Sequence, residues 1–202
     1  MTHAPAIKIE ELPDGLIIAV SGDARFEEAR LFVKAQYKQH FSCDLDEFFP
    51  EIFCLYDQGQ LLACCGFRSA ANEPLFLEQY LDEPVEHAVS HQVNYKVARG
   101  ALVELGGFAV ANKSVALAFM AQLAPTLYQS NFQYVSCTVT APVRRCLTKL
   151  GIQFYALGQA DPQKLKVNSG SWGTYYNLKP SVVVGAIHPV VQRLFPEIHR
   201  GA

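Results

Sequence analysis

The stretch Ala101-Leu-Val-Glu-Leu-Gly-Gly-Phe-Ala-Val110 is predicted to be a buried strand, because it is a short, largely apolar run. A helix is predicted to follow from about Lys113 to Gln129, and a second strand from Phe132 to Thr140. A further helix and the run Leu150-Gly-Ile-Gln-Phe-Tyr155 come next. Strand, helix, strand, helix, strand in this order predicts a β-α-β unit with a following return strand.

The start of the first helix has the properties of an anion-binding site. Asn112 or Ser114 can cap it, and a helix that follows a buried strand presents unpaired N–H groups and a positive dipole end. Most strand-to-helix turns share this geometry and bind nothing, so it leaves both interpretations open. Pro125 is expected to kink the helix or weaken its last turn. The apolar face follows a four-residue spacing: Val115, Phe119, Leu123 and Leu127, widened by Ala116 and Met120.

The second helix repeats these signals. Thr140 is expected to cap it, Pro142 to occupy its first turn, and Gly151 to close it in a left-handed conformation. A buried stripe is predicted from Val143, Cys146, Leu147 and Leu150.

The N-terminal half reads as short strands around one helix. Strands are predicted at 7–12 and 16–20, and Asp23 is a possible cap for an amphipathic helix over 24–40. A hairpin joins 52–56 to 61–68, and Gly66 suggests a bulge in its second strand.

The remaining elements carry weaker signals. Leu75–Leu81 fits either strand or helix, and Glu83-Pro84 resembles the first turn of a short helix ending at Ser90. Trp172–Tyr176 and Val182–Ile187 are predicted as strands, and a last helix as Val190–Phe195.

Composition limits the classes of function. The 202 residues, half of them apolar, are expected to form one domain over 1–202, and the formal charge of -2 with no dense basic cluster argues against nucleic acid. No stretch approaches the ~18 apolar residues of an integral membrane segment. The six cysteines lack metal-type spacing, so no metal site is expected, and the absence of a visible secretion signal predicts a cytoplasmic protein.

Five stretches carry a resemblance to known proteins, in the family's order and at its distances: Phe76–Leu81, Val103–Val110, Leu150–Ile152, Ala160–Pro162 and Trp172–Tyr176. They resemble the bacterial family named thermostable haemolysins, within the GNAT superfamily of acyl-CoA N-acyltransferases. The resemblance implies an α/β (α+β) fold with a mixed, bent central sheet and helices on both faces. It also implies acyl transfer from a thioester, either acetyl-CoA, a longer acyl-CoA or an acyl carrier protein, to a small amine.

The resemblance further implies a donor site. Backbone groups of Phe108, Ala109 and Val110 would pair with the pantetheine arm, and the amides of Lys113, Ser114, Val115 and Ala116 would face the pyrophosphate. GNAT enzymes usually carry Q/R-x-x-G-x-G/A at this helix start, whereas this chain has Val115-Ala-Leu-Ala-Phe-Met120. Many also place a tyrosine acid where this chain has Leu147.

Amine acylation needs a base, an oxyanion donor and an acid, and three side chains are candidates. Glu104 lies mid-strand in an apolar run, where burial would raise its pKa. The structural alternatives are pairing with Arg99 or Lys96, or a side chain that points to a solvated face. Glu78 is a catalytic candidate on the same grounds, and a structural salt bridge is the alternative interpretation of it. Trp172, Tyr175 and Tyr176 could line an acyl pocket, with Tyr175 or Tyr176 supplying a proton, or they could be core. Thr138 and Thr140 could donate to substrate, or simply form strand.

Two other functions compete with an acyltransferase. The family name suggests a membrane-active haemolysin, although the sequence shows no amphipathic pore hairpin or basic membrane-binding helix. The altered helix start suggests a non-catalytic ligand-binding relative. A homodimer is compatible with either.

Overall fold

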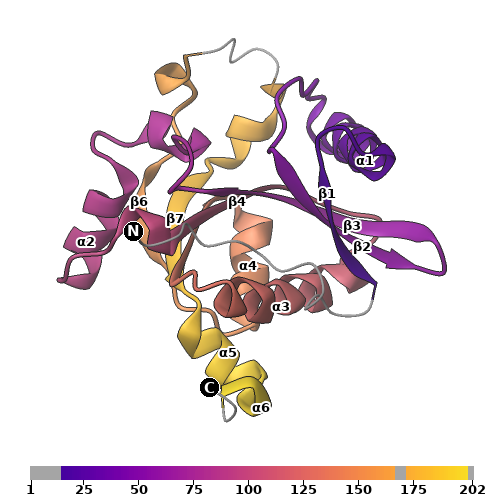
Figure 1. The fold of residues 1–202 in the computed structure, drawn as a ribbon. Coiled ribbons are helices and arrows are strands. Elements are labelled where there is room, and N and C mark those ends of the chain that lie inside the picture. Colours follow the sequence, from indigo (N-terminus) through magenta and orange to yellow (C-terminus); the bar gives the residue numbers. More distant parts are fainter. Residues whose placement is uncertain (1–14, 167–171, 200–202) are drawn as a thin grey trace.

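A computed structural model describes residues 15–166 and 172–199, and it confirms the element order predicted for the centre of the chain (Figure 1). The predicted strand at 7–12 lies outside the described residues. The strands are β1 (Leu16–Val20), β2 (Glu51–Asp57), β3 (Gln60–Ser69), β4 (Leu102–Val110), β5 (Tyr134–Val139), β6 (Tyr155–Gln159) and β7 (Ser181–Ala186). The α-helices are α1 (Ala24–Phe41), α2 (Val85–Val93), α3 (Lys113–Gln129), α4 (Ala141–Lys149), α5 (His188–Leu194) and α6 (Pro196–His199). Short 3₁₀ helices are η2 (Phe76–Tyr80), η3 (Arg99–Ala101), η4 (Pro162–Lys164) and η6 (Tyr175–Leu178).

The strands form one mixed, seven-stranded sheet in the order β1-β2-β3-β4-β5-β7-β6. Among the strands that the structure describes, β4 and β5 are the only parallel neighbours, since α3 carries the chain back between them. Figure 1 shows β4 in the middle, with β1, β2 and β3 on one side of it and β7 and β6 on the other. The predicted hairpin is therefore β2–β3, paired from Glu51↔Phe67 to Asp57↔Gln60.

Helices cover both faces of this sheet (Figure 1). On one face α1 packs through Phe26, Ala29 and Val33 against the β1–β4 half. On the other, α3 packs through Phe119, Leu123 and Leu127, together with Val191 of α5. A third cluster joins η2 and α2 to β4, β6 and β7. The predicted fold class, a mixed sheet between two helical layers, is confirmed.

β4 and β5 separate halfway along their length. Their pairing runs from Leu102↔Tyr134 to Leu105↔Cys137 and then stops, whereas β4 stays paired with β3 as far as Val110. Two glycines follow Leu105 in β4. A Cβ on Gly106 would lie 2.5 Å from the Phe49 ring, and Gly107 has a left-handed φ of 58°. The opposing β3 shifts register at Gly66, as the predicted bulge requires.

The signals at the helix ends are confirmed in part: Asp23 and Thr140 stand at the N-cap positions of α1 and α4, but their side chains make no capping hydrogen bond. Asn112 caps α3, its Oδ1 accepting from the Ser114 N–H at 3.1 Å, and α3 continues through Pro125. Thr140 precedes α4, and Gly151 follows it with φ of 60°. In the described part of the chain, no helix combines the length and hydropathy needed to span a membrane.

The strand predicted at Trp172–Tyr176 is wrong. This segment is a turn followed by η6, and Gly173 has φ of 52° with the Phe41 carbonyl oxygen 2.2 Å from where a Cβ would lie. A left-handed residue against a neighbouring backbone ends an extended run, so aromatic content misled the prediction. Within the Leu75–Leu81 stretch, which fits either strand or helix, Phe76–Tyr80 form a 3₁₀ helix.

Candidate active site

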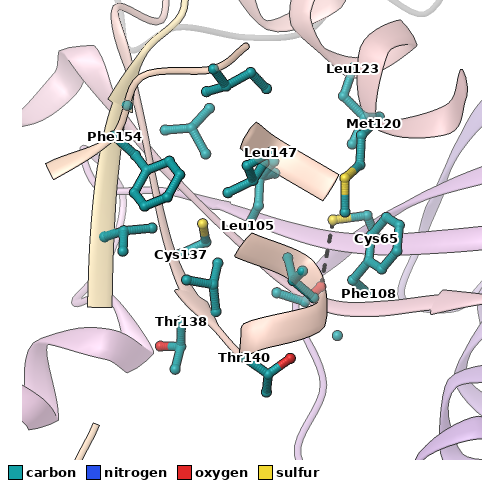
Figure 2. Close-up of a pocket in the computed structure, with 18 of the residues that line it drawn as sticks. Cys65, Leu105, Phe108, Met120, Leu123, Cys137, Thr138, Thr140, Leu147 and Phe154 are labelled. Atoms are coloured by element: carbon teal, nitrogen blue, oxygen red, sulfur yellow. Dashed lines mark hydrogen bonds between the residues drawn. The ribbon is translucent and has the colours of Figure 1, made fainter. Parts of the chain in front are cut away.

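A cavity of about 180 Å³ lies where β4 and β5 separate (Figure 2). It passes through the layers of the molecule, because its walls come from β4, β5, β7, α1, α3, α4 and α5. In Figure 2, Phe108, Met120 and Leu123 lie on one side of it and Phe154 on the other. Its walls are almost wholly apolar: Leu105, Phe108, Met120, Leu123, Leu127, Val135, Val143, Leu147, Phe154 and Ile187 are among them.

The inner face of α4 forms part of the cavity wall. The predicted stripe of Val143, Cys146, Leu147 and Leu150 is amphipathic as expected, but none of the four is fully buried. Val143 and Leu147 instead line the cavity, and Figure 2 shows the Leu147 side chain in its wall. Well-packed interiors leave few voids of this size, so apolar residues gathered around empty volume indicate room for an apolar ligand.

A few polar atoms interrupt the apolar walls. The Thr138 Oγ1 is buried and has no hydrogen-bond partner, and the Cys65 Sγ lies 3.7 Å from the Gly106 carbonyl oxygen, the dashed line in Figure 2. Cys137, Tyr37 and Tyr175 also line the cavity. Burial raises the pKa of the Cys137 thiol to about 12 and those of both tyrosines well above their usual range, so all three are protonated at neutral pH.

Glu104 lies outside the walls of the cavity. It is 2% exposed, and its carboxylate accepts the Phe76 N–H at 2.7 Å and the Leu77 N–H at 3.0 Å. Burial raises its pKa to about 7, although the two N–H groups and Arg68 act in the opposite direction. Neither predicted partner, Arg99 nor Lys96, contacts it. The cavity walls do not include Glu104, so a catalytic role remains a prediction without geometric support.

Glu78, which like Glu104 bonds the start of η2, is the centre of a salt-bridge network. Both of its oxygens contact Arg99, at 2.7 and 2.8 Å, and they also accept the Leu75 N–H at 2.8 Å and the Val85 N–H at 3.0 Å. Burial disfavours its charge, but Arg99 and these N–H groups outweigh burial and lower its pKa to about 2. Arg99 also bonds Glu86 at 2.7 Å. The geometry therefore supports the salt-bridge interpretation of Glu78.

These two carboxylates explain the 3₁₀ helix at 76–80. Glu104 takes two of the N–H groups at its start, and Glu78 takes the one before them. In turn η2 positions aromatic side chains: the Tyr80 and Tyr176 hydroxyls are 2.6 Å apart, and the Phe76 and Trp172 rings 5.8 Å. The carboxylates therefore hold the segment that supports the aromatic end of the cavity.

Tyr175 is the predicted catalytic residue that reaches the cavity. It is 7% exposed, and its ring packs against Tyr37, Phe41, Trp172 and Tyr176 at centroid distances of 6.3, 5.4, 5.3 and 5.3 Å. Sequence reasoning missed Tyr37 and Phe41 as part of the site. Both lie on α1, where helical periodicity marks them as core, and no sequence signal separates a core position from a cavity wall.

The predicted donor-binding residues lie at the mouth of the divergence. Beyond Leu105, the β5 side of β4 has no strand neighbour along Phe108–Val110, so this edge is open to an extended ligand. Phe108 lines the cavity and Ala109 is buried. At the start of α3, Lys113 and Ser114 are exposed, Val115 is half-buried and Ala116 is buried. Their contact with a donor remains a prediction.

Metal ligands do not gather anywhere in residues 15–166 and 172–199: no three His, Cys, Asp or Glu side chains there could hold an ion together. The cysteines in these ranges are free thiols.

Comparison with known proteins agrees with this architecture. A family model described as thermostable hemolysin matches residues 19–191. No curated protein sequence matches. The solved AHL synthase LasI has a TM-score of 0.59 at 13% identity, with 90% of this chain and 95% of that chain covered. FeeM, an N-acyl amino acid synthase from uncultured soil microbes, has a TM-score of 0.59 at 14% identity, with the same coverage.

A third solved structure is a CoA-dependent acyl-homoserine lactone synthase, BjaI, with SAM and isopentyl-CoA. It has a TM-score of 0.56 at 10% identity and covers 92% of this chain and 89% of its own. These neighbours share the GNAT-like acyltransferase fold, so the predicted fold is confirmed. At such low identity they show the fold and do not identify the substrate.

Proposed function

This chain belongs to the thermostable hemolysin family, and we propose that it is an N-acyltransferase that moves an acyl group from a thioester donor to a small amine. The observation that carries the proposal is the apolar cavity of about 180 Å³ at the divergence of β4 and β5. An engineered cavity of about 150 Å³ holds benzene, so this one has room for a chain of about six or more carbons. The solved neighbours are named as synthases of acylated amines, which supports the same chemistry.

In this proposal the acyl chain lies in the cavity and the pantetheine arm lies along the open edge of β4. The neutral amine nitrogen attacks the thioester carbon and the C–S bond breaks. The departing thiolate takes one proton and the new amide nitrogen releases one, so that an amide and a free thiol form. Tyr175 supplies the proton to sulfur and regains one released by the nitrogen, because Tyr175 lines the cavity and burial keeps it protonated. The unpartnered Thr138 hydroxyl is placed to donate to an oxygen of the acyl group.

A base is absent from the described part of the cavity wall, where no carboxylate or imidazole is found. The acceptor therefore reacts as the fraction that is already a neutral amine. This predicts a rate that rises with pH up to the pKa of the acceptor amine, in place of a bell-shaped profile.

The test is turnover by the purified full chain. Octanoyl-CoA and a fractionated extract of small amines are incubated with it, thiol release is followed, and acylated products are identified by mass spectrometry. Tyr175→Phe keeps the ring packing and is expected to lower kcat by about 100-fold, which is typical for loss of an acid. Tyr176→Phe is the matched control, because its hydroxyl contacts Tyr80 and does not line the cavity.

Two results would overturn the proposal. If octanoyl-CoA and an octanoyl carrier protein both fail to bind at millimolar concentration, the chain is not an acyltransferase of this kind. If pure protein lyses red cells without any acyl donor, while extracts of producing cells stripped of protein do not, direct membrane lysis is the better account.

A further inference from the structure

Acidic residues are absent from the segment that builds the cavity. Residues 105–160 contain four basic residues (Lys113, Arg144, Arg145 and Lys149) and no Asp or Glu. The rest of the chain holds the other 13 Lys and Arg and all 19 Asp and Glu, so the formal charges of the two parts are +4 and -6. The overall charge of -2 conceals this division.

Three of the four basic residues lie on one surface. Helix α4 begins directly after β5, and Val143 and Leu147 on its inner face line the cavity. Arg144, Arg145 and Lys149 are exposed, and helical spacing puts Arg145 and Lys149 opposite the inner face and Arg144 on the flank. Among the described residues no carboxylate forms an ion pair with any of these three. Helix α4 itself has no acidic residue. Its outer face is therefore a positive surface beside the proposed acyl site.

The arrangement of these charges fits an extended anionic surface better than one diphosphate. Arg144 and Lys149 are five residues apart, which is about 7.5 Å along a helix. At the α3 start, the Ser114 N–H already bonds Asn112, and Lys113 is the only basic residue. The large apolar side chains that are exposed, such as Leu31 and Tyr95, lie outside α3 and α4, so this face has nothing to insert into a membrane.

We propose that the outer face of α4 (Arg144, Arg145 and Lys149) docks an acidic acyl carrier protein, which presents its thioester-linked acyl chain to the cavity between β4 and β5. This inference rests on the proposed function and names the donor class for that site. Complementary charge steers such an encounter and fixes its orientation.

The test compares binding of two donors that carry the same acyl chain, each as a non-reactive amide analogue. Octanoyl carrier protein and octanoyl-CoA are titrated into the full chain by calorimetry. The double variant Arg144→Glu/Arg145→Glu is expected to weaken carrier binding by about tenfold or more and CoA binding by less than about threefold. Raising the salt concentration is expected to weaken carrier binding in the wild type and to have less effect in the variant.

Two controls separate charge from structural damage. Arg144→Lys/Arg145→Lys keeps the charge and is expected to bind the carrier like the wild type. Lys96, which is also exposed, lies near the far end of β4, and Lys96→Glu is expected to change neither affinity.

If octanoyl-CoA binds but the carrier does not, or if the Glu variants bind the carrier normally, the docking inference is wrong and the acyltransferase proposal stands. Binding of phosphatidylglycerol vesicles in place of the carrier, lost in the Glu variants, would also overturn it. Failure of both donors to bind would overturn the proposed function itself.

Discussion

On the η2 side of the molecule the Glu104 carboxylate accepts two backbone N–H groups at 2.7 and 3.0 Å, whereas in the wall of the cavity the Thr138 hydroxyl is buried with no partner. The first side is rich in charge, with Glu78, Arg99 and Glu86 linked together. The second has apolar walls and no described carboxylate. A buried polar group that is fully bonded serves structure, while one left unpartnered beside a cavity is available to a ligand. Removing the bonded Glu104 carboxylate should therefore lower the free energy of unfolding, whereas removing the unpartnered Thr138 hydroxyl should not.

The largest expected effect is on the anchored side. Glu104→Ala leaves the buried Phe76 and Leu77 N–H groups without an acceptor, so the free energy of unfolding should fall by about 3 kcal/mol. Urea unfolding followed by circular dichroism measures this. Glu104→Gln should lose less, because its amide oxygen still accepts one N–H. A loss below about 0.5 kcal/mol for Ala would contradict the anchoring role.

Glu104 also predicts a pH dependence. Its folded pKa of about 7 lies above the ordinary value of 4.5, so protonation favours the folded state. Its contribution is complete below pH 4.5 and is lost as the pH rises through about 7. The wild type should lose stability over this window relative to Glu104→Gln, which cannot titrate.

On the cavity side, Ala124→Phe should abolish room for a long chain without unfolding the protein, because Ala124 lines empty space. Turnover of octanoyl-CoA should fall about 100-fold, equivalent to about 2.7 kcal/mol, while acetyl-CoA turnover changes little. The ratio of kcat/KM values for the two donors measures this. Ala118→Phe, on the exposed face of the same helix, is the control. Equal loss for both donors would mean that the chain does not enter the cavity.

Glu78 should produce a smaller, acid-sensitive effect. Its pKa of about 2 is below the ordinary 4.5, so its stabilising contribution is complete above pH 4.5 and is lost as the pH falls through 2. Because Glu78 and Arg99 are partly exposed, Glu78→Gln should cost only about 1 kcal/mol at neutral pH. Melting temperatures of variant and wild type should converge near pH 2. A constant difference at all pH values would exclude the ion pair as the cause.

The smallest expected change in stability is at Thr138, where the substitution should not destabilise the protein. Thr138→Val replaces an unpartnered buried hydroxyl with a methyl group, so stability should be unchanged or rise by up to about 1 kcal/mol. Activity should nevertheless fall if the hydroxyl contacts the acyl group. Thr148→Val, exposed on α4, should change neither quantity. A loss of stability at Thr138 would show that its hydroxyl has a structural partner after all.

How far the sequence predicted this molecule depended on the range of the interactions involved. Local signals placed α3 at Lys113–Gln129 and identified Asn112 as its cap, because capping and periodicity act within one or two turns. Glu104 could not be assigned this way, since the N–H groups it binds are 27 and 28 residues distant in sequence. The cavity was equally hidden: Val143 and Leu147 have the spacing of core residues whether they meet other side chains or empty volume.

The position of Cys137 has a chemical consequence for the proposed reaction. A thiolate next to a thioester would exchange with it and trap the acyl group on the protein. Burial, reinforced by the nearby Glu104 charge, raises the pKa of Cys137 to about 12 and keeps it as the unreactive thiol. The burial that keeps this thiol protonated thus also protects the donor. Self-acylation at Cys137, visible as a mass increase on the intact chain, is the side reaction that this environment suppresses.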